Sequence, residues 1–159
     1  MAYLDTHPLH RAFIANKLER LVDQIAQQGD ELLQDAGLEI PSRTVSLVLL
    51  IGENGEISAA EVATKLKQPH QLVTQRADLL VKLAIIERRN DPNDSRRKIL
   101  ALTAKGKQQY DKLLIRLQEA VEAFTGLFEE IDTDLEVITT RAMQALKRSS
   151  LLKRIKSLP

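Results

Sequence analysis

The stretch DPNDSRRKILALTAKG, which spans residues 91–106, is the most informative part of this sequence. Its first four residues, Asp91-Pro92-Asn93-Asp94, suit a type I turn, because Asp favours the first position and Pro presets φ at the second. The apolar pair Ile85-Ile86 precedes this turn, and the β-competent run 99–102 follows it. The pattern predicts a two-stranded hairpin, or wing, with a charged tip at residues 85–102.

The window 88–98 around the tip is strongly basic. It holds two anions against five cations, which are Arg88, Arg89, Arg96, Arg97 and Lys98. A hairpin does not need this charge to fold, whereas the phosphates that line a nucleic-acid groove attract it. The net charge is −4 for residues 1–40, +4 for 41–106 and +1 for 107–159, so the positive share falls on the same segment. A run of charge is more often only a solvated surface. The positive charge indicates nucleic-acid binding only together with the fold predicted for the same segment.

Two helices precede the wing. The run from Ser58 to Glu61 is a capping box, in which both side chains satisfy free backbone donors at a helix start. This helix ends near Leu66, and Pro69 begins a second one, in whose first turn its missing N–H costs nothing. The second helix has an apolar stripe made of Val73, Ala77, Leu80 and Ala84. Its opposite, polar face carries His70, Gln71, Thr74, Gln75, Asp78 and Lys82.

A helix-turn-helix at 58–84 followed by a wing at 85–102 forms a winged helix-turn-helix, which places its second helix in the major groove of DNA. Gln71, Thr74 and Gln75 are the side chains we expect at base edges, since Gln pairs with adenine and Thr contacts the thymine methyl group. The alternative for these three is a solvated helix face. At the start of the helix, His70 suits a contact with the DNA backbone. Asp78 suits a structural role, paired to Arg76 or Lys82.

The run 74–106 resembles the signature region of the MarR transcription regulators. The matching residues are Thr74, Asp78, Leu80, Glu87-Arg88, Asp94-x-Arg96 and Leu102-Thr103-x-x-Gly106. The match needs no gap, and the lengths on either side also suit the family. Three residues depart from the family pattern. Gln75 replaces a frequent basic residue, Arg76 occupies a usually apolar position, and Ala84 replaces a usual Gly. We expect the first departure to alter the DNA sequence preference and the other two to repack locally.

The resemblance implies that Asp94 braces the wing and that Arg96 reaches the minor groove or its phosphates. The alternative for Arg96 is an ion pair with Asp94 or Asp91 that only holds the turn. Arg97 and Lys98 suit phosphate contacts, which add affinity without sequence choice. MarR-type proteins form homodimers through their terminal helices. They often release DNA when a small, usually aromatic or anionic molecule binds between those helices and the DNA lobe. No motif marks that pocket, so its residues are not assigned.

The outer segments are predicted to be helical. An amphipathic helix runs from about residue 9 to 36 and ends at Gly37. A very apolar helix from 41–42 to 51 follows, and Gly52 and the Asn54-Gly55 pair are expected to stop it. Glu56-Ile57 suits a third strand. After the wing, Thr103 suits an N-cap of a long helix with a coiled-coil-like seam made of Tyr110, Leu114, Leu117, Val121, Phe124 and Phe128. A second capping box, Thr133 to Glu136, opens a last helix that carries Leu135, Ile138, Ala142, Leu146 and Leu151-Leu152.

These segments predict a mainly α fold with a small β-hairpin wing. The chain forms a single MarR-type unit over 1–159, with a winged helix-turn-helix lobe at 37–106. The N- and C-terminal helices, 1–36 and 107–159, are the predicted dimerisation helices. A lobe of this size cannot cover their apolar stripes, and large exposed stripes mark association surfaces.

Composition excludes several other function classes. With no cysteine among 159 residues, the chain has no disulfide, no thiolate metal site and no thiol-based oxidant sensor. It has no glycine-rich phosphate loop and no nucleophile–base pair on a recognisable loop, which argues against an enzyme, and we expect no cofactor. A zinc site made of histidine alone is not expected either, because His7 and His10 lie close together near the start and His70 is far off. No apolar run approaches the roughly 20 residues of a membrane helix, and the N-terminus lacks the apolar core of a signal peptide. We therefore expect a cytoplasmic protein that does not bind membranes.

The best-supported function is a sequence-specific, DNA-binding transcription regulator. We expect a homodimer on a palindromic operator in double-stranded DNA, more often a repressor than an activator, with a possible small-molecule effector. The main alternative is a winged-helix adaptor that binds proteins without reading DNA, against which the basic wing and the Gln/Thr face argue. An enzyme, the third possibility, would require a convergent polar pocket, of which the sequence gives no sign.

Overall fold

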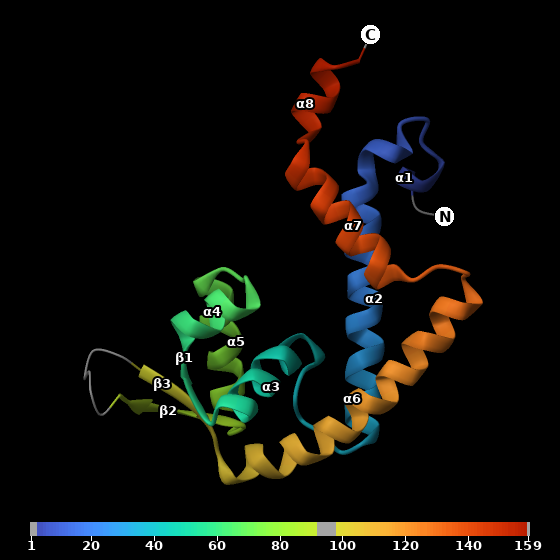
Figure 1. Ribbon diagram of the computed structural model, residues 1–159. Coiled ribbons are helices and arrows are strands. Elements are labelled where there is room, and N and C mark those ends of the chain that lie inside the picture. Colours follow the sequence, from blue (N-terminus) through green and yellow to red (C-terminus); the bar gives the residue numbers. More distant parts are fainter. Residues whose placement is uncertain (1–2, 92–97, 159) are drawn as a thin grey trace. The chain divides into compact units, whose positions relative to one another are not determined.

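The computed structural model describes residues 3–91 and 98–158 (Figure 1). It is mainly helical with a small three-stranded antiparallel sheet, which confirms the predicted fold class. The wing tip, with the predicted site residues Asp94, Arg96 and Arg97, lies outside the described residues. The chain divides into two compact units, residues 1–116 and 117–159, which are described in turn. No helix among the described residues has the length and apolar character that crossing a membrane requires.

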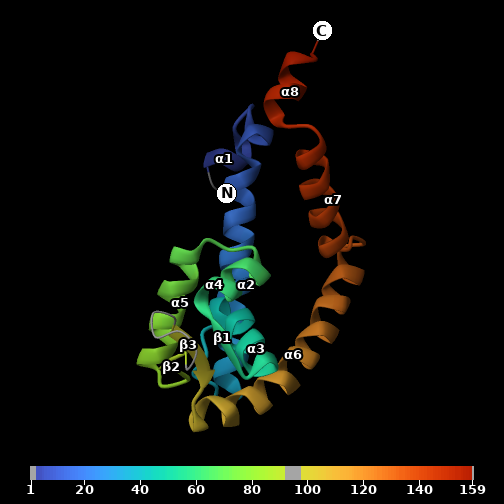
Figure 2. The same ribbon diagram turned by 60° about the vertical axis from the view of Figure 1, so that its left-hand side comes forward.

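The centre of the first unit is a winged helix-turn-helix. Its elements are α3 (Val45–Asn54), β1 (Glu56–Ser58), α4 (Ala59–Leu66), α5 (His70–Lys82), β2 (Ile86–Asn90) and β3 (Lys98–Leu102). The strand order is β1-β3-β2, and Leu100 of β3 lies between Ile57 of β1 and Arg88 of β2. The predicted hairpin and the third strand are thus both present. In the two views of Figures 1 and 2, α3, α4 and α5 gather around this sheet.

Local chemistry sets the ends of the helix-turn-helix. The capping box is formed: Ser58 N–H donates to Glu61 Oε2 at 2.9 Å, and Glu61 N–H donates to Ser58 Oγ at 3.3 Å. Helix α4 ends at Leu66 because Lys67 adopts a left-handed conformation with φ of 52°. Pro69 lies just before α5, as its N-cap, rather than inside the first turn.

A single apolar core lies inside the first unit. Val73, Ala77 and Leu80 of α5 are buried in it, as the stripe predicts. Ala84 is not part of that stripe: α5 has ended, and Ala84 is exposed with φ of 56°. The other fully buried side chains include Ile40, Leu47, Val48, Ile51, Val62, Ile85, Ile86, Leu100 and Leu113.

The N-terminal segment forms α1 (Tyr3–Thr6), the 3₁₀ turn η1 (His10–Phe13) and the long helix α2 (Ile14–Asp35). Helix α2 therefore begins five residues later than predicted. Its end is as predicted, because Gly37 has φ of 68° and Leu38 N–H donates to Leu33 O at 2.9 Å. A short 3₁₀ turn, η2 (Ser42–Thr44), leads from there into α3.

Of the predicted stop signals of α3, the Asn54-Gly55 pair is confirmed and Gly52 is not: the helix continues through Gly52 to Asn54 and ends where Gly55 has φ of 72°. Gly52 is not a stop because it serves packing: a Cβ on it would stand 2.2 Å from Cε2 of Tyr110. Tyr110 therefore packs against α3 and does not begin a free seam. Next to it, Leu113 is fully buried and Leu114 is 42% exposed.

Helix α6 (Ala104–Glu130) begins as predicted, with Gly106 N–H donating to the Thr103 hydroxyl at 2.9 Å. The second unit contains the end of α6, then α7 (Leu135–Arg148) and α8 (Leu151–Lys156). The N-cap of α7 is Asp134 rather than Thr133, because the Asp134 carboxylate accepts from Val137 N–H at 3.0 Å. The predicted last helix is broken at Ser149-Ser150, and the Ser150 side chain caps α8. No described residue of α7 or α8 is buried.

Candidate nucleic-acid interface

The structure brings the predicted base-reading residues together on one face of α5. His70, Gln71 and Gln75 are exposed and Thr74 is half-buried, all within the first two turns of the helix. The opposite face holds α5 against the core through its buried apolar side chains. This division matches the amphipathic pattern of the sequence. It leaves the polar face exposed, as a helix that enters a DNA groove requires.

The Thr74 hydroxyl is already engaged. It donates to the backbone carbonyl of His70 at 3.0 Å, one helical turn back, and lies 3.5 Å from His70 Nδ1. A hydroxyl has one hydrogen, so Thr74 Oγ1 keeps acceptor capacity only. Its remaining means of contact are that acceptor and its methyl group.

Arg76 belongs to the helix-turn-helix frame rather than to the polar face. Its guanidinium donates to Gln68 Oε1 at 2.7 Å and so joins α5 to the turn before it. Partial burial lowers the pKa of Arg76 below its ordinary value, and the nearby positive charge of Arg43 lowers it further. Arg43 in turn pairs with Asp23 of α2. The unusual arginine in this position is thus accommodated by a polar partner.

Asp78 is structural, as predicted, but its partner is neither Arg76 nor Lys82. Its carboxylate lies 2.6 Å from the guanidinium of Arg88, on β2. The prediction was wrong because it considered only neighbours along the helix, whereas the wing brings a cation from ten residues away. The pair links α5 to β2 at the base of the wing.

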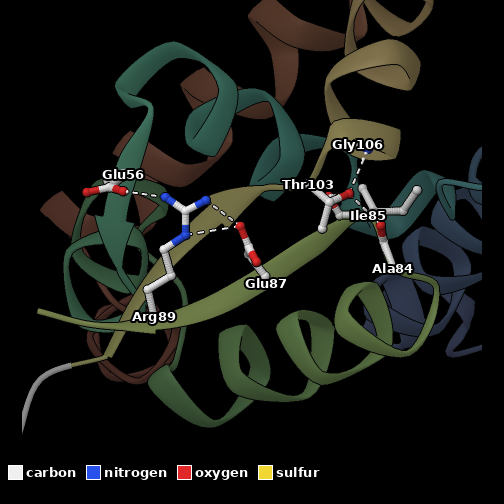
Figure 3. A network of polar contacts seen from close by, with 7 residues as sticks. All are labelled: Glu56, Ala84, Ile85, Glu87, Arg89, Thr103 and Gly106. Atoms are coloured by element: carbon white, nitrogen blue, oxygen red, sulfur yellow. Dashed lines mark hydrogen bonds and ion pairs between the residues drawn. The ribbon is translucent and has the colours of Figure 1, made fainter.

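Arg89 forms a second ion-pair cluster across the sheet (Figure 3). It lies 2.9 Å from Glu56 of β1 and also pairs with Glu87, its neighbour on β2. Because β3 runs between β1 and β2, this guanidinium connects the two outer strands over Ala101, to which both carboxylate residues are paired in register. The hydrogen bond and charge of Glu87, followed by those of Glu56, raise the pKa of Arg89 above its ordinary value.

The cations of the wing therefore divide into two groups. Arg88 and Arg89 are neutralised by carboxylates at the wing base. Lys98 is exposed and donates to the neutral side chain of Asn90. Arg96 and Arg97 lie outside the described residues. The sequence did not separate these cations, because Asp78, the partner of Arg88, and Glu56, one of the two partners of Arg89, come from other elements.

The start of α6 is locked to the end of the helix-turn-helix (Figure 3). The Thr103 hydroxyl donates to Ala84 O at 2.6 Å, and Thr103 N–H donates to Ile85 O at 3.1 Å. Gly106 packs directly on Ile85, where a Cβ would meet the carbonyl oxygen at 1.9 Å. The motif Thr103-x-x-Gly106 thus has a packing reason, which the sequence pattern alone did not reveal.

Comparisons with known proteins agree with this geometry. A MarR family model matches residues 38–97. A search of curated proteins found no match to the chain. Among solved structures, a mutant MarR of E. coli complexed with operator DNA is 21% identical, with a TM-score of 0.57, covering 84% of this chain and 94% of that one.

Two further structures are similar over nearly their whole length. The transcriptional regulator BldR from Sulfolobus solfataricus is 17% identical, with a TM-score of 0.60, covering 93% of this chain and 99% of that one. A MepR-like protein complexed with pseudoligands is 20% identical, with a TM-score of 0.61 and coverage of 92% and 96%. At these sequence identities, the solved structures show only that the folds are similar. The family model is a match to the sequence of the lobe. The lobe at residues 38–97 therefore belongs to the MarR family, and the chain as a whole has the fold of MarR-type regulators.

Proposed function

We propose that this protein is a sequence-specific, DNA-binding transcription regulator that acts as a homodimer. The observation that carries the proposal is the exposed polar face of α5, in a lobe that the MarR family model matches. The wing adds positive charge through Lys98 and through Arg96 and Arg97 in the sequence of its tip. An adaptor that binds only proteins has no need for this combination of glutamines and cations. A similar fold in complex with operator DNA gives further support.

The site residues have distinct roles in this proposal. Gln71 and Gln75 read base edges in the major groove, and Thr74 contacts a thymine through its methyl group. His70 contacts the DNA backbone at the start of α5. In the wing, Asp94 braces the turn, Arg96 reaches the minor groove, and Arg97 and Lys98 contact phosphates.

A two-fold dimer explains the apolar side chains that one chain leaves exposed. On α2 these include Ile14, Leu18, Leu21, Val22 and Ile25, each 36–56% exposed. The second unit adds Phe124, Val137, Ile138, Leu146, Leu151, Leu152 and Ile155. Such stripes are typical of an association surface. We assign residues 1–36 and 107–159 to dimerisation and residues 37–106 to DNA binding, so that two copies present two recognition helices to a palindrome.

We further propose that the protein is a repressor released by a small molecule. A dimer on an operator blocks other proteins from the same DNA, and a ligand that favours another arrangement of the two lobes weakens the complex. The binding of pseudoligands by a protein of similar fold supports an effector of this kind. Thermal unfolding of the protein with candidate aromatic acids, compared with DNA affinity in their presence, tests this part.

The central test is selection of duplexes from a random-sequence pool by the unchanged full-length protein. We expect a palindromic sequence, bound more tightly than random DNA by about a thousandfold or more at physiological salt. Affinity for random DNA should fall steeply with salt, because counterions are released. Equal, salt-independent binding of all duplexes would reject DNA reading and favour the adaptor.

A further inference from the structure

A single lysine at the start of α6 joins the two parts of the fold on which a dimeric DNA reader depends. Lys105 Nζ donates to Glu39 Oε2 at 2.8 Å and to the backbone carbonyl of Leu83 at 3.0 Å. Leu83 is the C-cap of the recognition helix α5, and Glu39 lies between α2 and η2. A cation at a helix C-terminus is favoured by the free carbonyls and the helix dipole there.

Gln109, one turn further along α6, holds the same segment more tightly. Its side chain is 8% exposed, so its polar atoms need partners inside the protein. Gln109 Oε1 accepts from the backbone N–H of Glu39 at 3.0 Å, and Gln109 Nε2 donates to Glu39 Oε1 at 3.5 Å. Glu39 is therefore held through both its backbone and its side chain.

The segment that these residues hold is continuous with a rigid attachment of α2. Ser42 N–H donates to Asp30 Oδ1 at 2.6 Å, and the Ser42 hydroxyl donates to Ala26 O at 2.7 Å. Gly29 permits this approach, since a Cβ on it would stand 3.0 Å from Ser42 Cβ. If the lobe moves relative to α2, either the contacts of Ser42 with α2 or the contacts of Lys105 and Gln109 with Glu39 have to break.

We propose that Lys105 and Gln109 are positioning residues that fix the direction of the recognition helix α5 relative to α2, and so set the half-site spacing that the dimer accepts. This rests on the proposed function, in which α2 contributes to the dimer and α5 reads DNA. In a two-fold dimer a rotation of each lobe moves the two α5 helices in opposite directions, so its effect on their separation is doubled. Half-sites lie about one DNA turn apart, and a fixed geometry rejects other spacings.

The experiment uses the palindromic duplex that the unchanged protein selects from a random pool. Further duplexes have one or two base pairs inserted or removed at its centre, and one carries a single half-site. Affinities are measured for Lys105→Ala, Lys105→Arg and Gln109→Leu. Lys107→Ala is the matched control, since Lys107 is an exposed cation on the same helix. Circular dichroism establishes that each variant is folded before its affinity is measured.

For the unchanged protein and Lys107→Ala we expect a change of two base pairs to weaken binding by about tenfold or more. Lys105→Ala and Gln109→Leu should reduce this spacing penalty to about threefold or less while binding the single half-site as tightly as the unchanged protein. Lys105→Arg should restore the penalty, because a guanidinium supplies the same positive charge and several N–H donors for the two acceptors.

An equal loss on every duplex for Lys105→Ala, with the spacing penalty intact, would overturn the inference and make Lys105 a phosphate contact. An unchanged penalty in the folded Gln109→Leu variant would overturn it as well. If the unchanged protein selects no duplex at all, the proposed function itself fails, and the inference fails with it. The first two results leave the proposed function standing, so the outcomes are distinguishable.

Discussion

Gly106 stands directly against the backbone carbonyl of Ile85, so close that a Cβ on Gly106 would lie 1.9 Å from that oxygen. The contact joins the first turn of α6 to the short connection between α5 and β2, in which Ile85 lies (Figure 3). A backbone carbonyl in a packed core cannot turn aside as a flexible side chain can. The glycine is therefore required by this approach and not by its own backbone conformation.

Gly106→Ala should lower the free energy of unfolding by about 1–3 kcal/mol, because the new methyl group overpacks a closely fitted site. Gly126→Ala is the control, since a Cβ on Gly126 in the same helix meets nothing within 4 Å. That change should raise stability by up to about 1 kcal/mol through helix propensity. Urea unfolding followed by circular dichroism measures both. A neutral Gly106→Ala would show that α6 is not held against Ile85.

The ion pair of Asp78 and Arg88 should show measurable coupling. Both side chains are partly exposed, at 48% and 37%, so we expect about 0.2–1 kcal/mol at low salt and less at high salt. A double-mutant cycle with Asp78→Asn and Arg88→Gln measures this term by urea unfolding. The same cycle with Arg76→Gln should give almost no coupling, because residues two apart do not face each other on a helix. Stronger coupling to Arg76 would contradict the structure.

The two DNA-reading elements should respond differently to substitution. Gln75→Ala should cost about 1–3 kcal/mol on the selected operator and little on random DNA, because it removes a base contact. Arg97→Ala should weaken both duplexes alike and reduce the salt slope by about one unit, as loss of a phosphate contact does. Affinity against salt concentration, measured for both duplexes, separates the two effects. If both variants changed the affinity for the two duplexes and the salt slope in the same way, the roles assigned to α5 and the wing would be wrong.

A charge at Phe124 should weaken the dimer. Phe124 is 38% exposed in the single chain, and its ring centroid lies 6.1 Å from that of Phe128. Burial of one such side chain contributes about 1.5–3 kcal/mol, which Phe124→Glu would remove. Gln118→Glu, at an exposed position of the same helix, adds equal charge and should leave the dimer intact. Sedimentation at micromolar concentration is the measurement, and a folded monomer of the unchanged protein would refute the proposed dimer.

Peroxide should not switch DNA binding through thiol chemistry. The chain contains no cysteine, and its two methionines oxidise by a slower route that thiol reductants do not reverse. Dilute peroxide should therefore leave the affinity for the selected operator unchanged over minutes. Rapid loss of binding that dithiothreitol restores would contradict this expectation.

Sequence alone determined the features that depend on neighbours along the chain. The capping box at Ser58, the left-handed end of α2 at Gly37 and the N-cap at Thr103 each need only residues within one turn. The amphipathic pattern of α5 determined which side chains are buried and which polar residues share a face. The winged helix-turn-helix followed from these local signals in their order.

Tertiary structure decided the contacts between elements, because each depends on which partner the folded chain brings near. Gly52 lies inside α3, where the Tyr110 ring fills the space beside it, and Asp78 pairs with Arg88 because β2 passes α5. Arg89 is neutralised, although it looks like a DNA contact in the sequence, because the sheet places Glu56 and Glu87 beside it. Hydrophobic spacing indicates which face of a helix is apolar. Only the packing between distant segments decides which part of the chain contacts that face.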